Sequence, residues 1–531
     1  MSEASGGPVT SFKRRGSRGV GEWYDVAIVG YGPVGQTLAI LLGERGVKVG
    51  VFEKQAAPYP MPRAVHFDHE IGRILQAAGV AEDLVGRTEP APIYEWRNAA
   101  GETLLRFGRD TGTSLSGWPE SNMFAQPELE ALLDARARSF SSVTVGRGCE
   151  VVAIQPGPEE VELGVVDGHG QKRLVRARYV AGCDGANSFV RSHLGASVTD
   201  LGFFFDWLIV DVIPHEKRVW EPLNWQLCDP ARPTTLVSGG PGRRRWEFMR
   251  LPGESIEELN SEKTAWRLLE PWGVTPSSAT LERHALYRFQ ARWVDTWRNG
   301  RLVLAGDAAH QMPPFAGQGL CSGIRDAANL AWKLDLVLAG KASEAILDTY
   351  PSERIPQVRA VIEFSMALGK VICVPDPDEA AARDARMIAA AKSVGLSPPL
   401  PPPALGPGLF VQGDRLAGHL FVQDRVRHGA RTGLFDDVVG RGWTLLSPRC
   451  DPVTRLDPEL AAFFASLGGV SAWVGNEGPV VDLNGSYARW FSAAGAAVVL
   501  QRPDFYVFGT GPLEDGTRRL VSTLRERLAL H

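Results

Sequence analysis

The glycine-rich turn at residues 30–35, GYGPVG, constrains the fold of this chain most. It follows an apolar run, YDVAIVG, and precedes an apolar helical run, QTLAILLGERG, after which VKVGVFEK reads as a second strand. In a GxGxxG turn Gly30 permits the tight bend, Gly32 lets a pyrophosphate approach the backbone, and Gly35 lets the helix pack on the strand. The pattern therefore predicts a parallel βαβ unit of a Rossmann-like α/β domain, with the helix N-terminus facing a dinucleotide phosphate.

A carboxylate at the end of the second strand indicates which nucleotide binds. Glu53 stands where an acidic side chain accepts the hydroxyls of an unphosphorylated ribose, so the turn favours FAD or NAD. The segment RLVLAGDAAHQMPPFAGQGL, residues 301–320, offers a second site: Asp307 follows a strand and can bond a chain of hydroxyls, and Gly317 and Gly319 open a long helix whose positive end can face an electron-rich ring. A ribityl-flavin needs such a second site and a nicotinamide nucleotide does not, so we predict bound FAD.

Composition limits the remaining classes of partner. The chain of 531 residues is long enough for two or three domains, and its net charge of −4 gives no reason to expect nucleic acid or an anionic membrane. The six cysteines form no CxxC pair, which argues against a metal site, a redox dithiol and a disulfide framework, and favours the cytoplasm. No run of 18 apolar residues is present, so no membrane span is expected.

The order of the segments predicts the domains. Residues 1–22 are polar and basic and are expected to form a disordered tail; residues 23–395 form the FAD-binding domain; the Pro-rich stretch at 396–408 reads as a linker; residues 409–531 form a small α/β domain. Strand-like runs between about 90 and 300, including VTVGRGCEVVAIQ and VELGVVD, are expected to form a separate sheet over the first domain. The insertion that carries this substrate-binding sheet is placed at about 90–120 and 195–295.

Three motifs in order carry a resemblance to a known family. GYGPVG, CDGANSFVR and AGDAAHQMPPFAGQGL resemble the flavin-dependent aromatic hydroxylases, single-component FAD monooxygenases of the para-hydroxybenzoate hydroxylase fold, over about residues 24–395. By this resemblance Gly306 and Asp307 bind the ribityl chain, Asp184, Gly185 and Arg191 belong to a motif associated with both FAD and NAD(P)H, and Arg63 and Gln126 touch the phosphate and ribityl region. The full set predicted to bind the cofactor is Gly30, Gly32, Pro33, Val34, Gly35, Glu53, Lys54, Arg63, Gln126, Asp184, Gly185, Arg191, Gly306, Asp307, Pro314, Gly317, Gly319 and Leu320.

A finer likeness points to the 3-(3-hydroxyphenyl)propionate hydroxylases and the related polyketide and phenol hydroxylases. It rests on PRAVHFDHEIGRIL, RRWEFM, LYRFQARW and the C-terminal RPDFYVFG. The last piece resembles the thioredoxin-like domain of these enzymes, here without CxxC and therefore structural. In such a family NAD(P)H reduces the flavin, O₂ adds at C4a, and the resulting hydroperoxide hydroxylates an electron-rich phenolic ring from which water is excluded.

The substrate-facing residues are predicted less specifically. His66 and Tyr287 are candidates for contact with the phenol, Pro313 for shaping the loop beside the flavin ring, and His310 is a weaker candidate, although a lone His in an apolar strand is more often a core residue. In RRRWEFMR, residues 243–250, one arginine could reach a substrate carboxylate, but a solvated turn is favoured, with Trp246 and Phe248 in the core.

Competing classes lack their own signals. A two-nucleotide disulfide reductase would show a second GxGxxG and a cysteine pair, and a flavin halogenase a WxW pair; neither is present. A hydroxylase of a polycyclic polyketide, another FAD oxidoreductase of this fold and a non-enzymatic FAD-binding regulator stay open. The partner is expected to be a small phenolic substrate, and the protein a monomer or a homodimer.

Overall fold

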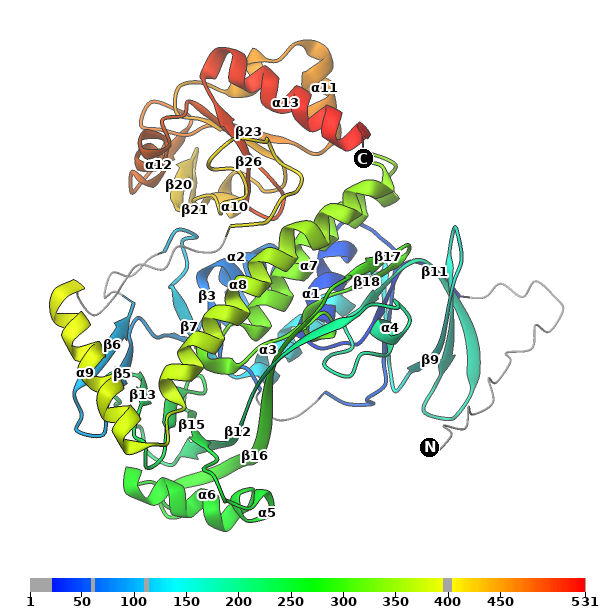
Figure 1. The fold of residues 1–531 in the computed structure, drawn as a ribbon. Coiled ribbons are helices and arrows are strands. Elements are labelled where there is room, and N and C mark those ends of the chain that lie inside the picture. The colour runs from blue at the N-terminus through cyan, green and yellow to red at the C-terminus, as the bar shows by residue number, and fades with distance from the viewer. Residues whose placement is uncertain (1–21, 59–62, 109–113, 395–403, 531) are drawn as a thin grey trace.

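The computed structural model describes residues 22–58, 63–108, 114–394 and 404–530. Most of the predicted tail (1–22) and of the predicted linker (396–408) lies outside these ranges; Glu22 already belongs to the first strand. Figure 1 shows a central sheet with long helices, a second sheet at one end of it, and a C-terminal unit, coloured yellow to red, packed on the opposite side.

The central sheet is mainly parallel and contains the predicted βαβ unit. Its strand order is β17-β18-β11-β1-β2-β8, with β1 and β2 joined through α1. Val26, Ala27 and Ile28 of β1 are fully buried, as expected for a parallel strand covered on both faces. The bounds are β1 Glu22–Val29, α1 Pro33–Gly43, β2 Val49–Glu53, α3 Gln126–Arg138, β8 Val143–Arg147, β11 Lys172–Gly182, α4 Phe189–Ser192, β17 Arg298–Asn299, β18 Leu302–Leu304, α7 Gly319–Leu338 and α8 Thr349–Ile372.

Three strands that we assigned to the separate sheet belong instead to this one. β8 pairs parallel with β2, and β9 (Glu150–Pro156) and β10 (Val161–Val166) form an antiparallel ribbon with β11. That expectation is wrong because an alternating pattern identifies a strand but not its partner. β11 is long enough to pair with β10 along one edge and with β1 along the other.

The second sheet collects strands from two distant parts of the chain, as expected for an insertion. Its order is β19-β16-β12-β15-β14-β13-β5-β6. One face, with Trp246 and Phe248, packs under α5 and α6; the opposite, inner face carries Trp207 and meets Phe315. The bounds are β5 Tyr94–Arg97, β6 Thr103–Phe107, β12 Val198–Pro214, β13 Asn224–Leu227, β14 Thr234–Ser238, β15 Arg244–Met249, α5 Ile256–Leu259, α6 Glu262–Leu269, β16 Ala279–Val294 and β19 His310–Gln311.

A small sheet and two helices complete this part of the chain. The sheet has the order β3-β7-β4. The bounds are β3 His66–Asp68, α2 His69–Ala77, β4 Thr88–Pro90, β7 Ser121–Phe124 and α9 Pro377–Val394.

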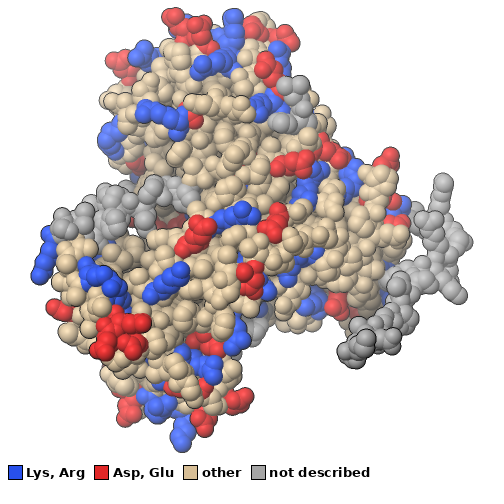
Figure 2. All heavy atoms as spheres, in the orientation of Figure 1, with Lys and Arg blue, Asp and Glu red and all other residues tan. Residues whose placement is uncertain are grey.

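The C-terminal unit contains a mixed sheet, β23-β22-β25-β26, and a smaller one, β21-β20-β24. It docks on the first part through buried ion pairs: Arg73 of α2 bonds Asp436 at 2.8 Å, and Arg502 bonds Glu353 of α8 at 2.7 Å. The bounds are β20 Arg425–His428, β21 Arg431–Leu434, α10 Phe435–Val438, β22 Thr444–Ser447, α11 Pro458–Ser466, β23 Val470–Trp473, β24 Val480–Asp482, α12 Ser486–Ala494, β25 Val498–Gln501, β26 Val507–Gly511 and α13 Leu513–Leu530. On the face drawn in Figure 2, acidic and basic side chains are interspersed over all of these units.

Candidate functional site

Three glycine-containing turns meet at the carboxyl ends of three neighbouring strands. β1, β11 and β18 run parallel, and they end just before Gly30, Cys183 and Ala305. Gly30 has a φ of +96°, and a Cβ there would lie 2.4 Å from the carbonyl oxygen of Cys183. The loop between β18 and α7, residues 305–318, is called here the late loop. A Cβ on Gly306 would lie 3.0 Å from Val34, so the glycine-rich turn at residues 30–35, called here the first turn, touches the late loop.

Two helices begin at this junction with free backbone N–H groups. At α1 the N-cap is Gly32 and Pro33 starts the helix, with neither a side-chain cap nor an acidic residue in the first turn. At α7, which starts at Gly319 after Gly317 (φ +63°), a side-chain cap and a first-turn acid are likewise lacking. A Cβ on Gly32 would meet no atom of the described chain within 4 Å. Both helix starts can therefore receive an anionic or electron-rich group.

Two carboxylates flank these helix starts. Glu53 accepts the backbone N–H of Tyr31 at 2.9 Å and of Gln55 at 2.8 Å, which leaves lone pairs for sugar hydroxyls. Asp307 is exposed to the space beside the late loop, and no side chain or backbone donor of the described residues bonds its carboxylate. Limited hydration raises the pKa of Asp307. A carboxylate in such a place is suited to accept hydrogen bonds from a polyol chain.

Comparison with known proteins identifies this junction. The FAD binding domain family model matches residues 23–365, and the HcaD C-terminal domain model matches residues 418–526. Over 491 residues the chain is 40% identical to the probable NADH-specific resorcinol 4-hydroxylase of Rhodococcus jostii (strain RHA1), covering 91% of each protein. The chain belongs to the FAD-dependent aromatic hydroxylases. This hydroxylase is a flavoprotein monooxygenase that uses FAD, NAD(P)H and O₂, and the open space at Gly32 and the unbonded Asp307 fit FAD.

Further relatives and solved structures agree with the assignment. The hydroxylase is 34% identical to a 3-(3-hydroxy-phenyl)propionate/3-hydroxycinnamic acid hydroxylase of Mycobacterium sp. (strain JLS), covering 91% of this chain and 89% of that protein. Its fold matches the flavin-dependent monooxygenase PieE, with TM-score 0.80, 22% identity and coverage of 95% and 99%. It also matches aklavinone-11 hydroxylase, with TM-score 0.77, 24% identity and the same coverage. Among the described helices, none has the length and apolarity needed to cross a bilayer.

The structure places several predicted cofactor residues in positioning contacts. Gln126 is buried; its Oε1 accepts the N–H of Ala64 at 2.7 Å, so it holds the loop that carries the exposed Arg63. The Asp184 carboxylate accepts the N–H of Phe189 at 2.7 Å and so caps α4. Arg191 donates to the carbonyl oxygen of Ala308 at 2.9 Å and so connects the segment after the turn at residues 183–185 to the late loop.

The remaining members of the predicted cofactor set lie around the same junction. Lys54 is exposed directly after β2, Pro314 begins a short 3₁₀ turn, and Leu320 is half-buried in the first turn of α7. Gly35 lies one turn into α1, where a Cβ would stand 2.3 Å from the Gly30 carbonyl oxygen, and Gly185 has a φ of +76°.

The predicted substrate residues fall into two groups: His66 and Pro313 lie at the late loop, and Tyr287 lies on the second sheet. His66 lies beside the late loop, with Nδ1 3.2 Å from the carbonyl oxygen of Gly317, and burial lowers its pKa. Tyr287 lies on the inner face of the second sheet, stacked on Phe289. Pro313 is fixed from outside the site, because its carbonyl oxygen accepts the Ser365 hydroxyl at 2.7 Å.

His310 is used elsewhere in the fold. It is 2% exposed, and its Nε2 lies 2.7 Å from the Asp326 carboxylate. The same carboxylate accepts Nε of Arg354 at 2.8 Å. His310 therefore belongs to a buried polar network behind the late loop.

The solvated turn expected at RRRWEFMR is wrong for two of its arginines. Arg244 and Arg245 begin β15 and are 2% and 3% exposed. Arg245 makes a bidentate ion pair with Asp211 at 2.7 and 3.0 Å. A buried guanidinium requires such a partner, and Asp211 comes from β12, far away in sequence. The placement of Trp246 and Phe248 in the core is confirmed.

Sequence reasoning missed one residue of the inner face, Glu247. It lies on β15 between Arg245 and Met249 and points to the face opposite Trp246 and Phe248. The alternation in RRWEFM contains this signal, because residues two apart on a strand share a face.

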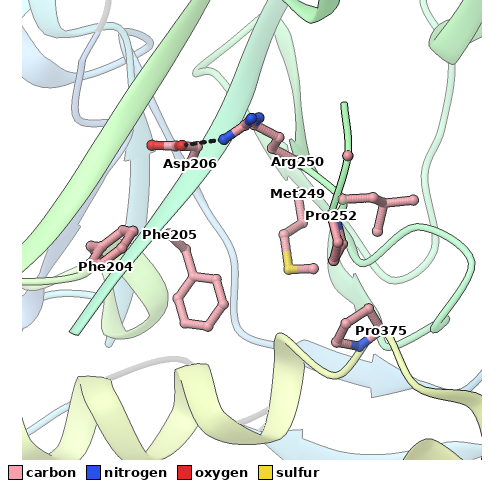
Figure 3. Close-up of a pocket in the computed structure, with 9 residues that line it drawn as sticks. Phe204, Phe205, Asp206, Met249, Arg250, Pro252 and Pro375 are labelled. Carbon is pink, nitrogen blue, oxygen red and sulfur yellow. Dashed lines mark hydrogen bonds and ion pairs between the residues drawn. The ribbon is translucent and has the colours of Figure 1, made fainter. Parts of the chain in front are cut away.

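A cavity lies next to this inner face. It has a volume of about 300 Å³, and Figure 3 shows Phe205, Met249 and Pro375 around it, with the ion pair of Asp206 and Arg250 at its edge. Phe205 packs on Phe203, and Phe203 in turn packs on Phe315 of the late loop. The cavity is therefore beside the cofactor junction and separated from it by aromatic rings.

Proposed function

We propose that this hydroxylase inserts one oxygen atom into a small phenolic ring held between the late loop and the inner face of the second sheet, with NADH as the preferred reductant. The observation that carries the proposal is the junction itself, where the first turn and the late loop meet at Val34 and Gly306 opposite that face. The name of the Rhodococcus relative supports both a dihydroxybenzene substrate and NADH. A 3-(3-hydroxyphenyl)propionate and a polycyclic aromatic polyketide are the alternatives.

The residues at the junction would then divide the work. FAD, when bound, accepts a hydride from NADH and activates O₂. Gly32 and the start of α1 would receive the pyrophosphate, Glu53 the ribose, and Asp307 the ribityl hydroxyls. His66 and Pro313 would fix the late loop beside the ring, and Tyr287 would contact the phenol. Trp207 and Phe315, 5.7 Å apart, would keep water away from the reacting atoms.

The C-terminal unit would be a structural, thioredoxin-like domain. Its sequence contains a single cysteine, Cys450, so it has no dithiol. Its buried ion pairs with α2 and α8 support a role in holding the cofactor domain. We place the enzyme in the cytoplasm, as a monomer or a homodimer.

The test of the proposed function is direct. The purified protein is expected to be yellow, to release FAD on denaturation, and to oxidise NADH faster when a phenol is added, with a product that has gained one oxygen atom. Absorbance, NADH consumption and product mass over a panel of dihydroxybenzenes, phenylpropionates and polycyclic phenols measure this. If the protein binds FAD but none of these compounds stimulates NADH oxidation, the proposed function is rejected, and a role as an FAD-binding regulator is favoured instead.

Asp307→Ala is expected to weaken FAD binding by about 1.5–3 kcal/mol, the value of a hydrogen bond to a charged group. Because no donor of the described protein bonds this carboxylate, the melting temperature of the apoprotein should stay unchanged. Titration of apoprotein with FAD, followed by flavin fluorescence, gives the affinity. An unchanged affinity would remove Asp307 from the cofactor site.

A further inference from the structure

The inner face of the second sheet has a charged centre. In the pairing of β12 with β15, directly opposite residues share a face, and the pairs are Asp211 with Arg245, Ile209 with Glu247, and Trp207 with Met249. Thr235 of β14 lies opposite Glu247 on the other side. An acidic residue thus stands in the middle of a face whose neighbours in the same row are apolar or uncharged.

Glu247 lies between the two places where this face touches the cofactor junction. On one side, Arg245 donates to the carbonyl oxygen of Arg63 at 2.5 Å. On the other, Trp207 packs against Phe315 of the late loop at 5.7 Å. Glu247 therefore faces the interval between the Arg63 loop and the late loop, where the proposed function places the phenol.

The Glu247 carboxyl has little to bond with inside the protein. Its side chain is 13% exposed, its nearest cation is Arg245 with Nη1 at 3.7 Å, and no hydrogen-bond donor of the described residues reaches it. Burial raises the pKa of Glu247, and the pKa of Tyr94 is raised by burial and by the nearby Glu247 charge. A carboxyl in such surroundings is stabilised by a donor from a ligand.

The arginines of the inner face already have an anionic partner. Asp211 holds Arg245 through two hydrogen bonds, and Nε of Arg283 lies 3.9 Å from the same carboxylate. Arg283 also lies over the ring of Tyr287, 4.9 Å from its centre. With Glu247 ionised, the positive charges of Arg245 and Arg283 are balanced by the negative charges of Asp211 and Glu247. A substrate carboxylate placed here would therefore be repelled by Glu247, with no excess positive charge among these four side chains to compensate.

We propose, resting on the proposed function, that Glu247 determines substrate specificity: it accepts a hydrogen bond from a hydroxyl of the substrate and thereby selects uncharged rings with two hydroxyl groups over phenols that carry a carboxylate. One hydroxyl activates the ring for oxygen insertion, and the second bonds Glu247. Ile209 opposite Glu247, and Ala285 beyond it on β16, supply the apolar surface for the ring.

Two substitutions and one control test this proposal. Glu247→Leu removes the acceptor, and Glu247→Gln keeps an acceptor but removes the charge. Glu95→Gln is the control: Glu95 is on β5 of the same sheet, next to the inner-face Trp96, and pairs with Arg97 at 2.6 Å. Resorcinol and 3-(3-hydroxyphenyl)propionate serve as probes, with kcat/KM from NADH consumption and Kd from the change in flavin absorbance.

Wild-type enzyme and the Glu95→Gln control are expected to prefer resorcinol. For Glu247→Leu with resorcinol, kcat/KM should fall and Kd should rise, each by about tenfold or more. For Glu247→Gln, the ratio of kcat/KM for resorcinol to that for the phenylpropionate should fall by about tenfold. FAD content should stay at the wild-type level in both variants, and the Glu95→Gln control should keep the wild-type rate of NADH oxidation without an aromatic compound. If Glu247→Leu does not fold, the proposal is tested by Glu247→Gln and by the wild-type Kd values for resorcinol and the phenylpropionate.

Two results would overturn this proposal while leaving the proposed function intact. One is a wild-type enzyme that prefers the phenylpropionate; the other is a folded, FAD-loaded Glu247 variant with wild-type preference. Failure of every phenol to stimulate NADH oxidation in the wild type would instead reject the proposed function.

Discussion

Glu353→Ala is expected to destabilise the protein by about 3–5 kcal/mol, the cost of removing one member of a buried ion pair. Glu353 is fully buried on α8, where its carboxylate accepts Nζ of Lys333 at 2.8 Å and Nη2 of Arg502 at 2.7 Å. It also accepts the N–H of Leu409 at 2.7 Å. The substitution leaves the buried Lys333 without an anionic partner and leaves Arg502 with Asp504 alone.

The loss should be cooperative across the interface with the C-terminal unit, because Arg502 belongs to that unit and Lys333 to α7. Urea unfolding gives the free energy, and limited proteolysis reports whether the C-terminal unit separates first. Glu344→Ala is the matched control, since Glu344 pairs with Arg301 at 2.9 Å but is 48% exposed, and its loss should cost at most about 1 kcal/mol. Equal effects of the two substitutions would contradict the role assigned to the buried network.

The stability of the protein at acid pH should depend on the same ion pairs of Glu353 with Lys333 and Arg502. The neighbouring cations, Arg502 foremost, outweigh desolvation and lower the pKa of Glu353 from 4.5 to about 2. A lowered pKa in the folded state means that the carboxylate stabilises the fold above its unfolded pKa. Its contribution is therefore lost as the pH falls from about 4.5 to 2, and Glu353→Ala should flatten the stability profile in that range.

Local features of the site follow from sequence, whereas its long-range contacts do not. The positive φ of Gly30 belongs to the turn itself, and the close neighbour of Gly35 is the Gly30 carbonyl oxygen, so the spacing of GYGPVG suffices to predict both features. The approach of Gly30 to Cys183 is a long-range contact that the motif does not contain. The inner face depends on which strands pair. The ion pair of Arg245 with Asp211 joins residues 34 positions apart, and no pattern within RRRWEFMR contains it.

The C-terminal unit gives a second instance of this limit. A Pro-rich stretch before residue 409 predicted a separate domain on a linker, which describes the chain's composition well. The buried contacts of Arg502 with Glu353 and of Tyr506 with Glu70, 436 positions apart, attach this unit firmly to the helices of the cofactor domain. Charged and hydroxyl side chains at such distances carry no sequence signal of being partners, because each reads as an ordinary surface residue.

Gly32→Ala and Gly35→Ala are expected to weaken FAD binding strongly for different physical reasons, and their comparison tests the cofactor site. A Cβ on Gly35 would stand 2.3 Å from the carbonyl oxygen of Gly30, so α1 must move off β1 and the apoprotein should lose stability. A Cβ on Gly32 meets nothing within 4 Å in the described chain. The Gly32→Ala apoprotein should therefore melt with the wild type, and even gain slightly from the stiffer backbone.

The same methyl group on Gly32 occupies the space in which a pyrophosphate approaches the start of α1. We expect FAD affinity to fall by about 100-fold or more, since a steric overlap and the lost N–H contacts add. Thermal melting of the apoproteins and fluorescence titration with FAD separate the two effects. A Gly32→Ala protein that is stable and binds FAD normally would show that the phosphates lie elsewhere, because the substitution changes the space outside the turn and leaves the protein's own packing as it was.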